Sequence, residues 1–530
     1  MNAKVHLGGN NLAEQENVFR QWIDVFDDNT RESLSRNYLS FKHKIIHEKH
    51  EVVTLFASSA LLRLEQYVML YFNDLPENPT KKVEDEMALL EAWLINNATF
   101  DLEVAEGTKP EAENLLGVLL VNQAAQYEFT ERKDFVYQTL LAHAFFEFLT
   151  NHPALSPYLQ EFLTRKHVET YGEYLRHLIG PYSAVFTGDT FGFRVTEDNP
   201  SVVDFFDSIA YDLSTNPFTI SGDTQPLDPD FKLLRAKPLI KEDDGTYYPL
   251  HYNFFVDKIY QGLVFDFYQT TSVSDKHKSF GNFLQFLGQE FAETHLFYKY
   301  IAECFLPKKY LVAVSGNQYK DIEYSDYYVR EGNTLFLFEF KNSLMRADVK
   351  QSKDFSAIRA EITKKFVYNP DNKKDKGIGQ LLNVMNKIAV EGFPFDDLNG
   401  KHVGRLHIFP IIVYTDDFFS LDGVQNIVSE EFQKKLSTQP IKRHQVNDVT
   451  LMHLQDIIDI QFLVQTGQIS FKAIMQEYAS KRKSLKQKKT RTPQELLIKY
   501  SGFRSLVHHL IPAYADQQAL LNRLTAALGF

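Results

Sequence analysis

The chain has 530 residues, a formal net charge of −12 and a single cysteine, Cys304. Its length predicts about three or four domains, and one cysteine excludes both an internal disulfide and a cysteine-based zinc site. The acidic balance argues against a protein that coats nucleic acid over its whole surface, so contact with a polyanion would need a local basic groove. No apolar run approaches the roughly 18 residues of a membrane span, and no apolar leader follows Met1. We therefore expect a cytoplasmic protein with no membrane partner.

In chain order, residues 1–215 are expected to be mainly helical, because apolar side chains recur every three or four positions without a longer repeat. The region carries no motif of its own, and we interpret it as a sensor or regulatory region. Residues 216–279 open with a stretch rich in Pro, Asp, Thr and Gly and are expected to connect domains. Within them the pattern predicts a strand near residues 246–250 and a helix near residues 253–267.

Residues 280–430 change from helical to alternating spacing and back again. The pattern predicts a helix (280–305), three strands (310–314, 321–329 and 334–341), a further helix (377–389) and an apolar strand (406–414). This order is typical of one compact α/β unit. Residues 431–530 return to helix, so the predicted class is a multidomain α plus α/β protein.

A short hairpin in this unit carries the strongest chemical signal. Gly332 and Asn333 lie between two strand-like runs and suit a two-residue turn. With that turn, Asp326 stands opposite Glu339, with Cβ atoms about 5 Å apart. Side chains alternate along a strand, so Lys341 shares the face of Glu339. The opposite face is apolar and consists of Phe336, Phe338 and Phe340.

Two carboxylates this close are expected to attract a cation. At about 5 Å they repel each other by roughly 3 kcal/mol at an effective dielectric near 20. Mg²⁺ or Mn²⁺ would relieve this repulsion, because both ions prefer oxygen ligands and retain water molecules for chemistry.

Asp326, thirteen residues before Glu339-Phe340-Lys341, resembles the signature of the PD-(D/E)xK, or restriction-endonuclease-like, nuclease superfamily. The resemblance covers about residues 280–415 and implies a restriction-endonuclease-like core with a mixed sheet. It also implies an endonuclease that hydrolyses phosphodiester bonds. We favour DNA over RNA as the substrate. It implies that Asp326 and Glu339 bind the metal ion and that Lys341 orients or activates water. Position 325 is Ser, where the signature has Pro.

Two further residues follow from the same resemblance. A glutamate on the helix before the strands often completes the metal site, and Glu290 and Glu293 are the candidates. At roughly 100° per residue, Glu290 lies about 60° and Glu293 about 120° from the centre of the apolar stripe, so we predict Glu290. A glutamine on the following helix matches Gln380. The tyrosine that some branches carry four residues later is Val384 here, which weakens assignment to the RecB-like branch.

Two lysine-rich stretches are candidates for phosphate contact. One cluster lies between Glu339 and Gln380, and we predict that it is the local nucleic-acid surface; it consists of Lys364, Lys365, Lys373, Lys374 and Lys376. The run at residues 481–491 has seven Lys or Arg and reads either as a solvated linker or as a phosphate-contacting arm.

The leading hypothesis is therefore an Mg²⁺- or Mn²⁺-dependent nuclease, in an architecture that loosely resembles bacterial anti-phage defence effectors. The alternative is an inactive nuclease-like scaffold, or a nucleic-acid-binding interaction protein. A partner protein or a homo-oligomer is compatible with either hypothesis.

Overall fold

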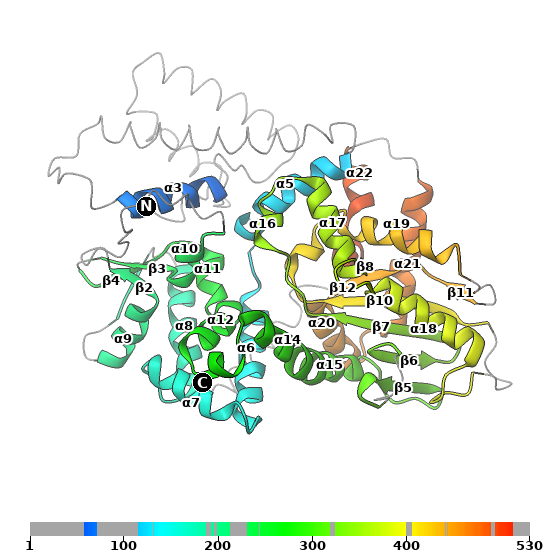
Figure 1. Ribbon diagram of the computed structural model, residues 1–530, viewed down its shortest axis with the longest axis horizontal. Helices are drawn as coiled ribbons and strands as arrows, with labels where there is room; N and C mark the ends of the chain where they lie inside the picture. The colour runs from blue at the N-terminus through cyan, green and yellow to red at the C-terminus, as the bar shows by residue number, and fades with distance from the viewer. Residues whose placement is uncertain are drawn as a thin grey trace, which may run out of the picture. The chain divides into compact units, whose positions relative to one another are not determined.

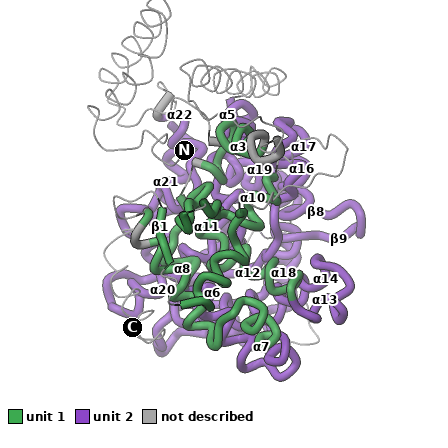
Figure 2. The backbone as a smooth tube through the Cα atoms, turned by 90° about the vertical axis from the view of Figure 1, so that its left-hand side faces the viewer, with its two compact units in different colours: residues 1–106, 126–139, 159–270 green, residues 107–125, 140–158, 271–530 purple. Residues whose placement is uncertain are grey.

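The computed structural model describes residues 58–71, 115–130, 132–186, 192–195, 199–212, 230–242, 244–318, 324–398, 405–439, 441, 444–488 and 493–511. The chain divides into two compact units (Figure 2). Unit 1 comprises residues 1–106, 126–139 and 159–270, and unit 2 comprises residues 107–125, 140–158 and 271–530. Among the described helices, none has both the length and the apolar character needed to cross a membrane.

Unit 1 combines helices with a small mixed sheet. The strands are β1 (Phe193–Arg194), β2 (Ala210–Asp212), β3 (Leu239–Lys241) and β4 (Thr246–Pro249), in the order β1-β4-β3-β2. Its helices are α3 (Ser58–Tyr71), α8 (Tyr171–Phe186), α9 (Pro200–Ser208), α10 (Lys232–Ala236), α11 (Tyr252–Asp257) and α12 (Gln261–Thr270). Three further helices contribute residues to both units: α5 (Leu115–Thr130), α6 (Phe135–Asn151) and α7 (Ser156–Arg165).

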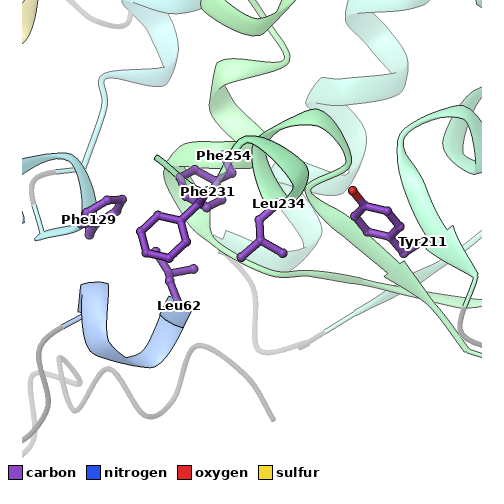
Figure 3. Close-up of a cluster of buried hydrophobic side chains, with 6 residues drawn as sticks. All are labelled: Leu62, Phe129, Tyr211, Phe231, Leu234 and Phe254. Carbon is purple, nitrogen blue, oxygen red and sulfur yellow. The ribbon is translucent and has the colours of Figure 1, made fainter. Parts of the chain in front are cut away.

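An apolar cluster connects distant segments of unit 1 (Figure 3). Phe129 meets Phe231 edge to face, with ring centroids 5.3 Å apart. The cluster consists of Leu62, Phe129, Tyr211, Phe231, Leu234 and Phe254. α10 and α11 contribute to this cluster, and β4 pairs with β3, so the described residues of 230–270 are part of a folded unit and not a connecting segment. Residues 216–229 of the predicted connecting segment lie outside the described residues.

A buried ionic network lies beside this cluster. Asp257, only 5% exposed, accepts from the Lys133 ammonium and lies 3.4 Å from the Arg235 guanidinium. Arg235 also pairs with Glu128 at 2.8 Å and lies over the Phe254 ring, 4.6 Å from its centroid. Each buried carboxylate of this network therefore faces a hydrogen-bonded cation, as buried charges require.

Unit 2 is built on a mixed sheet with the order β11-β10-β7-β6-β5, in which β12 also pairs with β10 (Figure 1). β5, β6 and β7 form an antiparallel meander, whereas β10 is parallel to β7, β11 and β12. The strands are β5 (Leu311–Ser315), β6 (Tyr327–Glu331), β7 (Thr334–Lys341), β10 (His407–Tyr414), β11 (Gln445–Val446) and β12 (Thr450–His453).

The described helices of unit 2 surround this sheet. Before the meander come α13 (Val273–Lys276), α14 (Phe280–Leu287), the π-helix η5 (Gly288–Phe297) and α15 (Tyr298–Glu303), and the 3-10 turn η6 (Gly316–Gln318) follows β5. Between β7 and β10 lie α16 (Ala347–Lys350), α17 (Phe355–Phe366), the β8 (Tyr368–Asn369) and β9 (Lys374–Asp375) pair, and α18 (Ile378–Glu391). The remainder are η7 (Asp417–Ser420), α19 (Val424–Leu436), α20 (Leu454–Gln465), α21 (Phe471–Gln487), α22 (Pro493–Tyr500) and α23 (Phe503–Val507).

The hairpin register predicted from the sequence is confirmed. Glu331 pairs with Thr334, and Gly332 adopts φ +63°, a conformation that glycine tolerates best. One face of β7 is apolar, as expected, since Phe340 stacks on Phe297 at 4.9 Å and Phe338 contacts Phe471 at 5.7 Å.

The predicted boundary at residue 430 does not separate two regions. β11 and β12 extend the sheet beyond β10, and the residues that follow belong to the same compact unit. The strand at 450–453 has no separate signal because a helix of similar apolar content follows directly at Leu454, and the strand at 445–446 has only two residues. Residues 431–530 therefore help to build the sheet and are not a separate helical region.

Candidate active site

The hairpin brings Asp326 to the end of β7. β6 begins at Tyr327, which pairs with Phe338, so Asp326 directly precedes the strand, one position beyond that pair and beside Glu339. The Phe340 backbone N–H donates to Oδ2 of Asp326 at 2.6 Å. This hydrogen bond holds the Asp326 side chain against β7, although the regular pairing of β6 with β7 ends at Tyr327.

Lys341 connects the hairpin to the following helix. Its Nζ donates to Oε1 of Glu339 at 2.6 Å and to Oε1 of Gln380 at 3.0 Å. Gln380 lies in the first turn of α18, where the same Oε1 accepts the Gly377 backbone N–H at 2.9 Å. The glutamine therefore caps its helix and holds the lysine with one oxygen.

The electrostatics of the site are dominated by burial. Glu339 is 1% exposed, and burial together with the neighbouring Asp326 carboxylate raises its pKa to about 8. Burial likewise raises the pKa of Asp326, while the Lys341 ammonium opposes this shift. For Lys341, burial disfavours the ammonium, but Glu339 and Asp326 outweigh that effect and raise its pKa. Lys341 is therefore held as a cation between acids.

A third carboxylate comes from Glu293 in η5, and it differs from the residue predicted on the helical wheel. Burial and the Asp326 carboxylate raise the pKa of Glu293, and Glu293 also acts electrostatically on Glu339 and Lys341. Glu290 is exposed. The wheel assumed an α-helix throughout, whereas residues 288–297 form a π-helix with i→i+5 hydrogen bonds. The changed angular step brings Glu293, not Glu290, to the site.

Two residues of the site carry no signal in the sequence pattern. The Tyr298 hydroxyl donates to Oε1 of Glu293 at 2.5 Å. Gly316 follows β5, and its backbone N–H donates to the Asp326 carbonyl at 2.8 Å. Tyr298 occupies a position on the apolar helix face that reads as core filler, and its role becomes visible only from its partner.

The five predicted lysines separate into three groups. Lys364 pairs with Asp371 at 2.5 Å and Lys365 with Glu361 at 3.2 Å. Lys373 and Lys374 are exposed. Lys376 is half-buried, and its pKa is lowered first by burial and then by the Lys341 ammonium. The pKa of Lys376 therefore depends on charged groups of the site, Lys341 and Glu339.

The basic run at 481–491 is largely engaged within unit 2. Arg482 is buried and lies 3.4 Å from Oδ1 of Asn426, and Lys486 pairs with Asp448 at 2.7 Å. Lys488 pairs with Glu495 at 2.8 Å. Residues 489–491 lie outside the described residues. In the described part of the run, these contacts connect α21 with Asn426, Asp448 and Glu495.

The donor set of the site suits a hard divalent cation. Asp326, Glu339 and Glu293 offer carboxylate oxygens, the ligands that Mg²⁺ and Mn²⁺ prefer, and they outnumber the single ammonium of Lys341. Over the described ranges, no group of three or more His, Cys, Asp or Glu side chains is arranged to hold a metal ion. The fit to an ion thus rests on the carboxylate chemistry of these residues, and in this structure Glu339 is engaged by Lys341 and Asp326 by a backbone amide.

Comparison of the chain with protein-family models, with curated proteins and with solved structures finds no match.

Proposed function

We propose that this protein is a metal-dependent nuclease that hydrolyses phosphodiester bonds in nucleic acid, with DNA the favoured substrate. The observation that carries the proposal is the convergence of Asp326, Glu339 and Lys341 at one end of β7, with Gln380 beside them. The strand and helix order of unit 2, three antiparallel strands followed by a helix and a parallel strand, supports a restriction-endonuclease-like core.

Asp326, Glu339 and Glu293 would hold the divalent ion through their carboxylate oxygens. When bound, such an ion polarises a phosphate and makes water a better nucleophile. Lys341 would orient the attacking water, because its ammonium is held at two points by Glu339 and Gln380. It also offers positive charge to the phosphate oxygens as the water oxygen attacks phosphorus and the P–O bond to the leaving group breaks.

The experiment is incubation of the purified full-length protein with plasmid, single-stranded DNA and RNA, with Mg²⁺, with Mn²⁺ and with EDTA. We expect cleavage with metal ion, none with EDTA, and none by Glu339→Ala or Lys341→Ala proteins that retain the wild-type circular dichroism spectrum. Full activity in either variant, or undiminished cleavage in EDTA, would refute the proposal.

A second candidate, a noncatalytic nuclease-like scaffold, is favoured by one observation. The Lys341 ammonium contacts Glu339 directly at 2.6 Å, so the pair already neutralises part of the acidic site without any metal ion. A titration with Mn²⁺ followed by electron paramagnetic resonance separates the two functions. Binding with a Kd in the micromolar-to-millimolar range supports the nuclease, and absence of binding together with absence of cleavage supports the scaffold.

A further inference from the structure

Tyr298 lies at the junction of the π-helix η5 and α15, five residues after Glu293. In a π-helix the hydrogen bonds join residues five apart, so these residues lie on the same side of the helix. The Tyr298 hydroxyl accordingly donates to Oε1 of Glu293 at 2.5 Å. An α-helix would place residues four apart on one side, and this pair depends on the wider turn.

The hydroxyl is also enclosed by the turn after β5. A Cβ atom added at Gly316 would lie 2.9 Å from the Tyr298 hydroxyl oxygen and 3.2 Å from the Asp326 carbonyl oxygen. The Gly316 backbone N–H donates to that same carbonyl. Gly316 therefore lets the chain approach closely, so that one turn touches both the Tyr298 hydroxyl and the backbone of Asp326.

The Tyr298 ring itself has little freedom. It is 8% exposed, and its centroid lies 5.8 Å from the Tyr327 ring and 5.6 Å from the Phe297 ring. With the ring packed on both sides and the hydroxyl confined by Gly316, the direction of the hydrogen bond to Glu293 is fixed by several independent contacts. Without this hydrogen bond, the Glu293 side chain could sample several rotamers.

We propose that Tyr298 is a positioning residue that orients the Glu293 carboxylate toward a divalent cation shared with Asp326 and Glu339. The inference rests on the proposed nuclease function. Tyr298 engages one oxygen of Glu293 and leaves the second oxygen for the ion. Partners that hold a metal ligand from behind typically contribute 10–100-fold to metal affinity or activity.

Tyr298→Phe tests the proposal, because it removes only the hydroxyl and keeps the packed ring. We expect the Mn²⁺ dissociation constant, measured by electron paramagnetic resonance without nucleic acid, to rise about 10-fold. The Mg²⁺ concentration for half-maximal cleavage should rise by the same factor, while kcat at saturating Mg²⁺ changes by less than about 3-fold. The matched control is Tyr327→Phe, which removes a hydroxyl from the neighbouring buried ring and should leave both quantities unchanged.

Gly316→Ala provides a second route to the same contact. The added Cβ should displace the Tyr298 hydroxyl and weaken Mn²⁺ binding several-fold in the wild-type background. In the Tyr298→Phe background the same change should weaken metal binding by a smaller factor than in the wild-type protein, because only the contact of the added Cβ with the Asp326 backbone remains. The same factor in both backgrounds would contradict the proposal, because Gly316→Ala would then act only through the Asp326 backbone and not through the Tyr298 hydroxyl.

The outcomes distinguish the inference from the function on which it rests. If wild-type protein binds Mn²⁺ and cleaves, but Tyr298→Phe retains wild-type metal affinity, the positioning role is wrong and the nuclease stands. A fall in kcat at saturating metal with unchanged affinity would also overturn it. If wild-type protein neither binds Mn²⁺ nor cleaves, the nuclease proposal fails, and the positioning role fails with it.

Discussion

The two units differ in how their buried carboxylates are paired with cations. In unit 1, Asp257 and Glu128 lie against Lys133 and Arg235, so that each carboxylate has a cation within hydrogen-bonding or ion-pair distance. At the end of β7 in unit 2, three carboxylates surround one lysine, and the pKa of each acid is raised. In a matched network the loss of one partner leaves the other charge buried and unpaired, whereas crowded buried acids with raised pKa values favour a bound cation that takes the place of a proton.

The largest expected effect is on catalysis. Glu339→Gln removes the group that would become a charged ligand when the ion binds, and should reduce metal-dependent cleavage by about 10²–10³-fold, the scale of losing one electrostatic contributor at an active site. Single-turnover rates on plasmid DNA at saturating Mg²⁺ measure it. Near-wild-type rates would mean that the charge of Glu339 is not used, and the contrast between the units would lose its functional meaning.

The next effect concerns the stability of unit 1. Asp257→Ala leaves Lys133 and Arg235 buried without their shared carboxylate, and should reduce the free energy of unfolding by about 3 kcal/mol. Urea unfolding followed by tryptophan fluorescence and circular dichroism measures the change. Glu339→Gln is the comparison, because it should leave the stability of the metal-free protein nearly unchanged or raised. Equal destabilisation by both variants would remove the distinction between the two regions.

A matched pair of glutamates tests the π-helix. Glu293→Gln should weaken Mn²⁺ binding about 10-fold or more, because Glu293 interacts with Asp326 and Glu339. Glu290→Gln, on the same helix but exposed, should change binding less than 2-fold. Isothermal titration calorimetry with MnCl₂ gives both values. A larger loss of Mn²⁺ affinity in Glu290→Gln than in Glu293→Gln would favour Glu290 as the metal ligand, as the α-helical wheel predicted.

The pH dependence follows from Glu339, whose pKa is raised from 4.5 to about 8. The folded, metal-free protein retains this proton where the unfolded chain releases it. The stabilising contribution is therefore complete below about pH 4.5 and is lost as the pH rises through about 8. A bound divalent ion would replace the proton. The increase in Tm caused by saturating Mg²⁺ should therefore grow from about pH 6 to about pH 8.5.

Differential scanning fluorimetry across this pH range measures the effect, with Glu339→Gln as the control that should flatten it. A Tm increase that stays constant with pH in the wild-type protein would show that no proton is displaced from Glu339 when the ion binds.

The smallest effect is expected at the lysine cluster. Replacing exposed Lys373 and Lys374 together by Ala should weaken DNA binding a few-fold and reduce the salt dependence of log K by up to about 2. Replacing Lys364 and Lys365 should have less effect, because these side chains already pair with Asp371 and Glu361. Fluorescence anisotropy at several salt concentrations compares the pairs, and equal losses would contradict this division of the cluster.

Several features of the site could be predicted because they depend on neighbours in sequence. The turn at Gly332 and Asn333 and the two-residue period of strands together place Asp326 beside Glu339 and put Lys341 on the same face. Gln380 was predicted from the family resemblance alone, and its contact with the Gly377 backbone N–H, three residues earlier, is local.

Other features depend on contacts between segments far apart in the chain. β12 pairs with β10 through residues nearly forty positions away, and nothing in the short 450–453 segment distinguishes it from the start of the next helix. Gly316 meets Tyr298 across the end of β5, a close approach that no spacing rule anticipates.

By itself, the sequence determined the hairpin register and the set of acids and lysine on one strand face, because turn geometry and strand alternation are local properties of the backbone. Only the tertiary structure decided that Glu293 interacts with Asp326 while Glu290 is exposed, that Tyr298 donates to Glu293, and that β11 and β12 extend the sheet beyond residue 430. The physical reason is that the π-helix changes the angle between successive side chains, and packing between distant segments determines which of them reach the site.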